Sequence, residues 1–217
     1  MKKNKKILVV GRAGLDLYAH PINTPIENAS QFTSQLGGSA ANIAAGLAIQ
    51  GNNVDLMSPI SNDSIGDFVI NSCKKIGINT LLLEKVSNLK NTLAIVDTMG
   101  DKTNAVLYRE KPADLFIDET FLKKVDLDSY LMIIVTGTSL SRNPSRNNVL
   151  KLMEFYNKLR SNVWFDKFDG SFFSSSDAFI FFTEPGDLII TRQNAVHGDF
   201  PTINKTKRTM IVKHYLF

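Results

Sequence analysis

Unbroken runs of apolar residues recur along this chain. The clearest is Ile7 to Val10, which ends at Gly11, and a second run covers Leu131 to Val135. Shorter runs lie at Val163 to Phe165 and at Leu188 to Ile190. Continuous apolar runs of strand length are typical of β-strands that are covered on both faces. The pattern therefore predicts the strands of a buried sheet.

Segments with helical spacing lie between these runs. Ala40 to Gln50 is rich in small apolar residues, and Gly51 is a suitable C-terminal stop. A second helix is predicted for Pro144 to Arg160, with Asn143 as its N-cap and Pro144 at the first helical position. Its apolar residues recur on one face: Val149, Leu152, Met153, Tyr156 and Leu159. Alternating strands and helices predict an α/β fold around a mostly parallel sheet.

One segment interrupts this alternation. Thr92 to Glu110 contains two runs rich in β-branched residues on either side of the turn Met99 to Lys102. This pattern predicts a hairpin that belongs to no parallel sheet and forms a flap or an edge. From Lys167 onward the periodicity weakens, because serine, phenylalanine and turn residues are mixed without a clear repeat.

Composition is typical of a globular protein with one domain. The 217 residues are 43% hydrophobic and 21% charged, with a formal net charge of +4. Much of the positive excess lies in a short N-terminal lysine cluster, which we interpret as a solvated tail; nucleic-acid binding is the less favoured alternative. The cluster consists of Lys2, Lys3, Lys5 and Lys6.

The same composition argues against a secreted or membrane protein. The apolar run after the lysines is too short for a signal peptide, and Arg12 and Asp16 follow it. No segment reaches the ~20 apolar residues needed to span a bilayer. The single cysteine, Cys73, excludes an internal disulfide and a multi-cysteine metal site. We expect a cytoplasmic protein without a metal centre, a membrane partner or a nucleic-acid partner.

Two glycines and a carboxylate follow the first predicted strand. Gly11 and Gly14 lack the third glycine of a dinucleotide-binding loop, and Asp16 would repel a pyrophosphate. A nicotinamide-dependent dehydrogenase is therefore disfavoured. A carboxylate at this end of the strand can instead accept hydrogen bonds from sugar hydroxyls. The alternative is that Asp16 is a turn or capping residue.

A glycine pair opens the first predicted helix. Gly37 and Gly38 would let the backbone approach a ligand closely, and Asn42 lies about one turn into the helix. The Asn amide offers donors and an acceptor, which suits hydroxyls, and no lysine follows the glycines as in a phosphate-binding loop. The alternative is a helix packed closely through its small residues.

Four motifs in order resemble one known family. The segments GRAGLDLY, LGGSAANIA, LYREKPADL and VTGTSLSRNPSR are similar to the ribokinase-like (PfkB) sugar kinases, and within them to the kinases of 5-dehydro-2-deoxygluconate. The similarity covers about residues 7 to 166. It implies a doubly wound, mostly parallel α/β sheet with a small β-sheet lid, whose strands would lie at about 16–35 and 92–110. The whole chain, 1–217, would be a single ribokinase-like domain.

The resemblance also implies a substrate site. Residues that match Asp16, Gly37, Gly38 and Asn42 surround the sugar hydroxyls in this family. A Tyr-Arg pair of the lid binds the carboxylate in related kinases of keto-sugar acids. Its equivalents here are Tyr108 and Arg109, and a guanidinium offers the forked donors that a carboxylate accepts. The alternative for Arg109 is a surface salt bridge with Glu110 or Asp114.

The resemblance is incomplete in the C-terminal half. The family has a Gly-Ala-Gly-Asp motif whose amides hold the transferred phosphoryl group and whose Asp is the base. Here Ser174, Ser175 and Ser176 replace the small residues, and Asp177 keeps the acid. Serines at positions that need positive φ each cost of order 1 kcal/mol or more. The nucleotide-binding part, about 166–217, would be shortened.

Two functions from different classes follow. The first is ATP- and Mg²⁺-dependent phosphorylation of a sugar or keto-sugar acid, specifically 5-dehydro-2-deoxygluconate in myo-inositol breakdown. The second is an inactive homologue that binds a sugar acid, or forms a homodimer through its lid, without turning over ATP. Both require a pocket walled by the side chains of Asp16, Asn42 and Arg109.

Overall fold

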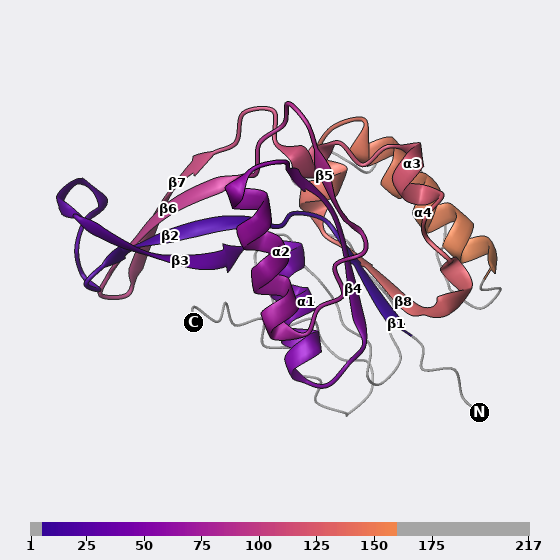
Figure 1. Cartoon of the computed structure of the whole chain (residues 1–217), viewed down its shortest axis with the longest axis horizontal. Coiled ribbons are helices and arrows are strands. Elements are labelled where there is room, and N and C mark those ends of the chain that lie inside the picture. Colours follow the sequence, from indigo (N-terminus) through magenta and orange to yellow (C-terminus); the bar gives the residue numbers. More distant parts are fainter. Residues whose placement is uncertain (1–5, 160–217) are drawn as a thin grey trace, which may run out of the picture. The chain divides into compact units, whose positions relative to one another are not determined.

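A computed structural model describes residues 6–159, all within one compact unit, and contains two four-stranded sheets (Figure 1). We call the first the body sheet. It has the order β5-β4-β1-β8, and each neighbouring pair of strands is parallel. Its strands are β1 (Lys6–Val10), β4 (Val54–Ser61), β5 (Leu83–Val86) and β8 (Tyr130–Val135). The predicted runs at 7–10 and 131–135 are therefore both strands of a parallel sheet.

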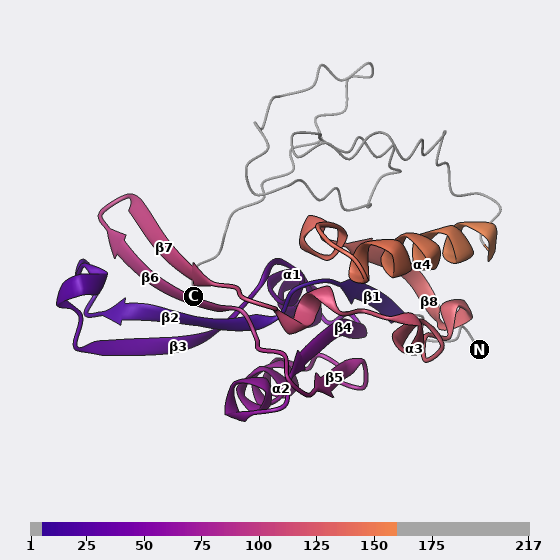
Figure 2. The same ribbon diagram turned by 90° about the horizontal axis from the view of Figure 1, so that it is seen from above.

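Helices cover both faces of the body sheet. The helices α1 (Ser39–Ile49) and α2 (Ser64–Ile76) lie side by side against one face (Figure 1). The short α3 (Glu119–Leu122) and α4 (Ser145–Leu159) lie on the other side (Figure 2). This arrangement confirms the doubly wound architecture expected from the sequence, and it explains why the central strands are apolar throughout.

The side chains of β1 alternate between the two faces of the body sheet and are buried on each face. Leu8 and Val10 point to the α4 side, where they form a cluster with Val149 and Leu152. Val9 is also fully buried, and it points to the opposite face because successive side chains of a strand alternate. Tyr156 and Met153 pack at the edge of the α4 cluster, as the helical spacing predicted. The side chain of Leu159 lies outside the described residues.

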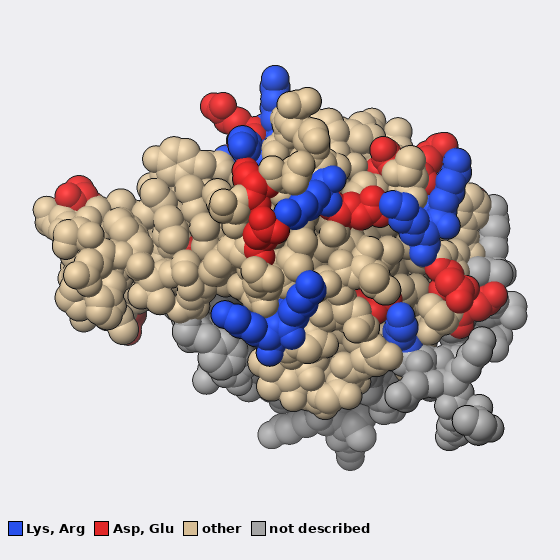
Figure 3. Space-filling model, in the orientation of Figure 1, with Lys and Arg blue, Asp and Glu red and all other residues tan. Residues whose placement is uncertain are grey.

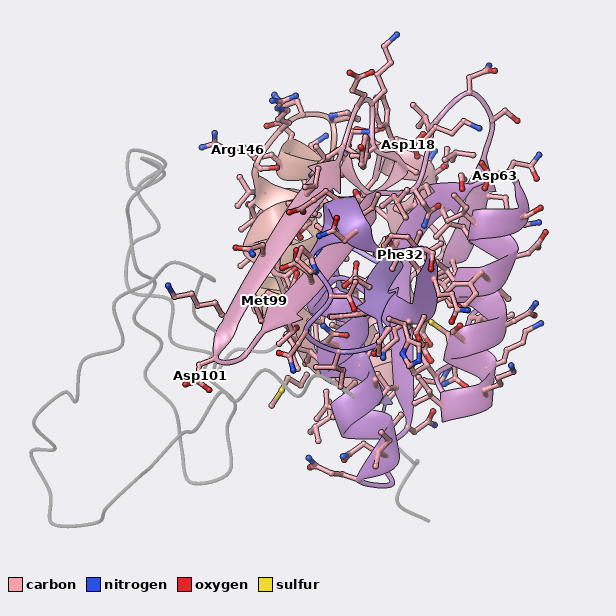
Figure 4. All side chains as sticks on the ribbon, turned by 90° about the vertical axis from the view of Figure 1, so that its left-hand side faces the viewer. Phe32, Asp63, Met99, Asp101, Asp118 and Arg146 are labelled. Carbon is pink, nitrogen blue, oxygen red and sulfur yellow. The ribbon has the colours of Figure 1, made fainter. Side chains whose placement is uncertain are left out.

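The second sheet, which we call the lid, has the order β3-β2-β6-β7. Its strands are β2 (Gly14–His20), β3 (Gln31–Gly37), β6 (Leu93–Met99) and β7 (Lys102–Tyr108). The predicted hairpin is confirmed as β6 and β7, but it is not isolated, because β6 pairs in parallel with β2. Figure 4 shows its tip, marked by Met99 and Asp101, while Asp63 and Asp118 lie at the N-termini of α2 and α3.

The boundaries of two predicted helices can now be compared with the structure. The helix α1 begins one residue before the predicted Ala40, and Gly51 adopts a positive φ of 85° just after its end, as expected of a stop. The helix α4 begins at Ser145, so Pro144 precedes the helix and Asn143 is not its N-cap. The Ser145 hydroxyl is used elsewhere, since it accepts from the Ile117 N–H at 2.9 Å.

The connections are short and contain single 3₁₀ turns: η1 (Ile26–Asn28), η2 (Ala113–Leu115), η3 (Leu127–Ser129) and η4 (Gly137–Leu140). Among the helices of residues 6–159, none is long and apolar enough to cross a membrane. In the view of Figure 3, charged side chains gather over the body, and the projecting lid carries few. The predicted runs at 163–165 and 188–190 lie outside the described residues.

Candidate functional site

The candidate site lies where the body sheet meets the lid. The strand β1 ends at Val10, and only Gly11, Arg12 and Ala13 separate it from the first lid strand, β2. The carboxyl ends of β1, β4 and β8 therefore open toward the base of the lid. Ligands of doubly wound folds bind at this edge of the sheet, so the connectivity alone brings the lid to a potential binding crevice.

Asp16 is positioned by the glycine that the sequence singled out. It is the third residue of β2, and Gly37 ends the neighbouring strand β3. A Cβ at Gly37 would overlap the Asp16 carboxylate, so only glycine leaves room for this side chain. Asp16 Oδ1 is buried and has no hydrogen-bond partner among the described residues. Burial raises the pKa of Asp16, and the charge of Arg12 opposes that rise. Asp16 is not a helix cap, so the capping alternative is excluded.

Gly38 brings the N-terminus of α1 to the same place. It is the N-cap of α1 and has a φ of 108°, which L-residues with side chains rarely adopt. A Cβ there would also overlap the carbonyl of Arg12. The Ala41 N–H donates to that carbonyl at 3.3 Å. The glycine pair therefore has two functions: Gly37 makes space for a side chain, and Gly38 allows a close backbone contact.

Asn42 lies in the first turn of α1, as predicted. Its backbone N–H donates to the Gly38 carbonyl at 2.9 Å. Its side chain is exposed and makes no hydrogen bond with the described residues, so the amide is available to a ligand.

Tyr108 and Arg109 stand at the end of β7, but they differ in environment. Tyr108 is 58% exposed. Arg109 forms a two-pronged ion pair with Asp114: Nη1 donates to Oδ1 at 3.0 Å and Nη2 donates to Oδ2 at 2.7 Å. Nη1 also donates to Thr92 Oγ1 at 2.6 Å. Asp114 is only 1% exposed. The predicted alternative of a pair with Asp114 is thus present, with a buried carboxylate and a guanidinium side chain that is 25% exposed.

Arg12 belongs to this site, and the sequence analysis gave it no role. Its Nη1 is buried and has no hydrogen-bond partner in the described part of the chain. Burial lowers the pKa of Arg12, and the nearby Asp16 carboxylate acts in the opposite direction. The charges of Arg109 and Asp114 also act on it, in opposite senses. The available signals were its place in the motif GRAGLDLY and its position two residues after the end of the buried strand β1.

Two hollows of the described surface lie elsewhere. One of about 620 Å³ is lined by residues at the start of α3 and α4, including Asp118, Asn143 and Lys151. Another of about 490 Å³ lies beside Lys6 and Asn79. Neither includes Asp16, Asn42 or Arg109, so a pocket walled by these three side chains stays a prediction.

The predicted phosphoryl-transfer residues are beyond the described part. Ser174, Ser175, Ser176 and Asp177 all lie outside residues 6–159. Within the described residues, no group of three or more His, Cys, Asp or Glu side chains could hold a metal ion. The described site is therefore the part of the chain that would contact a sugar, without the part that would contact a nucleotide.

Relatives of known name support the resemblance seen in the motifs. A 5-dehydro-2-deoxygluconokinase of Clostridium tetani is 34% identical over 167 residues, which are 76% of this chain and 49% of the relative. The enzyme of the same name from Mesomycoplasma hyopneumoniae strain 232 is 35% identical over 157 residues, 70% of this chain and 46% of the relative. The chain thus spans about half the length of the curated relatives it matches.

A solved structure supports the fold. The fructokinase of Xylella fastidiosa, crystallised with bound ATP, superposes with a TM-score of 0.62 at 24% identity, covering 71% of this chain and 46% of the other. The ribokinase-like α/β fold predicted from the motifs is therefore confirmed. The pfkB family carbohydrate kinases match residues 4–180. With its fold, its motifs and its relatives in agreement, the chain belongs to the pfkB family of carbohydrate kinases.

Proposed function

We propose that this protein transfers a phosphoryl group from ATP to a sugar acid, and that the acid is 5-dehydro-2-deoxygluconate of myo-inositol catabolism. The relatives named above support this substrate. The proposal places the reaction in the cytoplasm, where ATP is supplied. The chain would act as a single ribokinase-like domain, 1–217, whose nucleotide-binding part is about 166–217.

The observation that carries the proposal is the Asp16 carboxylate. Its Oδ1 is buried without a donor among the described residues, and Gly37 has no side chain that would displace it. Buried polar atoms nearly always have a partner, and an ionised carboxylate can only accept. A ligand that donates hydrogen bonds satisfies this oxygen, and a polyhydroxylated sugar does so without adding charge.

The remaining site residues fit the other groups of a sugar acid. The exposed amide of Asn42 and the backbone at Gly38 would contact hydroxyls from the α1 side. Tyr108 and Arg109 would approach the carboxylate from the lid. Because Arg109 is already paired with Asp114, its guanidinium would be held in one position, and the pair would present less positive charge to the ligand than a free guanidinium.

The transfer step is assigned to residues outside the described part. Asp177 would remove the proton of the accepting hydroxyl, and Ser174, Ser175 and Ser176 would donate hydrogen bonds to the phosphoryl group. ATP would enter as a substrate, with Mg²⁺ on its phosphates.

A coupled assay of ADP release tests the proposal. It is run on the full chain with ATP, Mg²⁺ and a panel of neutral sugars and keto-sugar acids. We expect turnover with 5-dehydro-2-deoxygluconate above that with fructose. Asp177→Asn should reduce the rate by at least about a hundredfold, the usual contribution of a general base. A rate unchanged by Asp177→Asn contradicts the assignment of the base.

The serines at 174–176 favour a second candidate function, an inactive homologue that binds a sugar acid without turning over ATP. Titration calorimetry separates the two functions. A kinase gives heat with Mg²⁺-ATP and with the sugar acid, whereas the inactive homologue gives heat with the sugar acid alone.

We also propose a homodimer formed through the lid. Both edge strands of the lid are exposed and carry apolar side chains, including Phe32 on β3 and Leu107 on β7. Exposed strand edges readily pair with a second copy, and apolar side chains favour such a contact. Sedimentation of the wild-type chain and of Leu107→Glu tests this: the variant should shift a dimer toward monomer.

A further inference from the structure

Two opposite charges at the base of the lid lack the partners that buried charges require. Arg12 Nη1 and Asp16 Oδ1 are both buried, and neither makes a hydrogen bond with a described residue. They also form no ion pair with each other, although each affects the pKa of the other. Leaving buried charged groups unpaired is costly, so the two atoms mark one donor and one acceptor that are not satisfied within residues 6–159.

The second guanidinium of the site is different, because its Nη1 and Nη2 both already donate to acceptors of the protein. Arg109 donates to both oxygens of Asp114 and to the Thr92 hydroxyl. Thr92 in turn donates to Asp114 Oδ1 at 3.2 Å, which closes the network. If a ligand carboxylate took the N–H groups that Arg109 donates to Asp114, a partly buried pair would have to break, whereas Nη1 of Arg12 has no such pair to lose.

The backbone around Arg12 is fixed from two sides. Its carbonyl accepts from the Ala41 N–H of α1 at 3.3 Å and lies against Gly38. The next carbonyl, that of Ala13, accepts from Asn91 Nδ2 at 3.2 Å. A fixed backbone limits the positions that the Arg12 side chain can reach, which lowers the part of the association cost that comes from ordering the loop.

We propose that Arg12 binds the carboxylate of the sugar acid through Nη1, while Asp16 accepts a hydroxyl of the same molecule, and that Arg12 is the main determinant of preference for an acid. This inference rests on the proposed function. A guanidinium matches the geometry of a carboxylate, and a hydroxyl donates to the unpartnered Asp16 oxygen. One ligand with both groups would satisfy both atoms. Arg109, held by Asp114, would contribute less.

Calorimetric titration of the full chain tests the proposal, with 5-dehydro-2-deoxygluconate and the neutral ketohexose fructose as probes. Arg12→Gln removes the charge but keeps hydrogen-bonding capacity. We expect it to weaken binding of the acid by at least about tenfold, the usual effect of losing a hydrogen bond to a charged group. Its affinity for fructose should change by less than about twofold. Arg142→Gln, the same change at an exposed arginine, is the matched control and should alter neither.

A second variant, and a melting curve recorded for each variant, distinguish a binding role of Arg12 from a loss of the folded structure. Arg12→Lys keeps the charge without the forked donors, so its affinity for the acid should lie between those of the wild type and Arg12→Gln. If fructose binds too weakly for its affinity to be measured, the order of the three affinities for the acid (wild type, Arg12→Lys, Arg12→Gln) tests the proposal. Equal weakening of both ligands by Arg12→Gln overturns the proposal, because it indicates a structural role.

Two further results separate this inference from the function on which it rests. If the wild-type chain binds the acid, Arg12→Gln binds it equally well and Arg109→Gln loses it, the role of Arg12 is overturned and the proposed function stands. If the wild-type chain binds no sugar acid at all, both are overturned.

Discussion

The body sheet and the lid have equal numbers of strands and opposite exposure. All eight residues of β4 in the body are buried, whereas all seven residues of β7 in the lid are exposed. Helices cover both faces of the body sheet, and its strands are all parallel. The lid mixes parallel and antiparallel pairs and leaves both of its edges open. The two sheets are therefore stabilised to different degrees.

This difference in burial indicates that the two sheets have different roles, one in stability and one in positioning candidate ligand-binding residues. Burial of apolar surface, the dominant favourable term in folding, is concentrated in the body. The lid contributes little to that core, yet it brings Asp16 and Arg109 to the carboxyl ends of the body strands. The charged groups that could recognise a ligand gather at the junction, where a buried sheet and an exposed one meet. Substitutions that are matched in chemistry but placed in different sheets test this division.

The largest difference should come from removing the same side chain from each sheet. Leu8 in β1 is fully buried, whereas Leu107 in β7 is 55% exposed. Leu8→Ala should lower the free energy of unfolding by about 2–5 kcal/mol, and Leu107→Ala should change it by less than about 0.5 kcal/mol. Urea unfolding followed by circular dichroism measures both. Equal losses would show that the lid shares the stability of the body.

The next largest effect concerns the ion pair between Arg109, which follows the lid strand β7, and Asp114 of η2. Asp114→Asn should lower the free energy of unfolding by about 1–3 kcal/mol, because it weakens a buried, two-pronged pair whose arginine is partly exposed. Glu119→Gln is the matched control, since Glu119 forms an exposed pair with Lys151 at 2.8 Å. We expect no measurable change from the control. Similar losses from both variants would contradict a special role for the junction.

A smaller effect is expected from substituting two glycines, Gly37 at the end of β3 and Gly46 within α1. Gly46 lies inside α1, and an added Cβ there meets no atom within 4 Å. Gly46→Ala should raise the free energy of unfolding by about 0.5–1 kcal/mol through its helix propensity. Gly37→Ala should instead displace the Asp16 carboxylate and weaken binding of the sugar acid. Urea unfolding and calorimetry measure the two effects, and a Gly37→Ala variant with normal binding would exclude this role of Gly37.

The smallest effect is a pH-dependent change in stability at Asp16. Burial raises the pKa of this group above its ordinary 3.8, so the folded protein binds the proton more tightly than the unfolded chain. The contribution of Asp16 to stability is therefore greatest below pH 3.8 and is lost as the pH rises through the folded pKa. Relative to wild type, Asp16→Asn should become more stable between pH 4 and pH 7, as measured by melting temperatures. A relative loss of stability over that range would show that Asp16 is paired.

Much of the fold could be predicted because its pattern is local. The strands β1 and β8 are continuous apolar runs, and the hairpin of β6 and β7 has a recognisable turn. The strand β4 was not predicted, because polar residues such as Asp55 interrupt it. Asp55 is buried, and its carboxylate accepts from Tyr130 Oη and Asn79 Nδ2, both at 2.6 Å, and from Lys6 Nζ at 3.2 Å. Partners so distant in sequence leave no periodic signal.

Part of the candidate site could be predicted because some of its residues also lie in local sequence motifs. The motifs identified Asp16, the glycine pair and Arg109. They could not show that Arg109 is occupied by Asp114, or that Arg12 is not occupied. Which of two arginines has a buried nitrogen without a partner depends on packing between strands and loops that are far apart in sequence.

The contacts of Asp114 have one more consequence. Thr92 precedes β6 and Arg109 follows β7, so both ends of the hairpin are attached to a single carboxylate. The Gly100 turn lies at the opposite end of the hairpin from this carboxylate. Insertions at the Gly100 turn should therefore be tolerated, as they are at other exposed loop tips. The hairpin can thus change in length at its tip while both of its ends stay attached to Asp114.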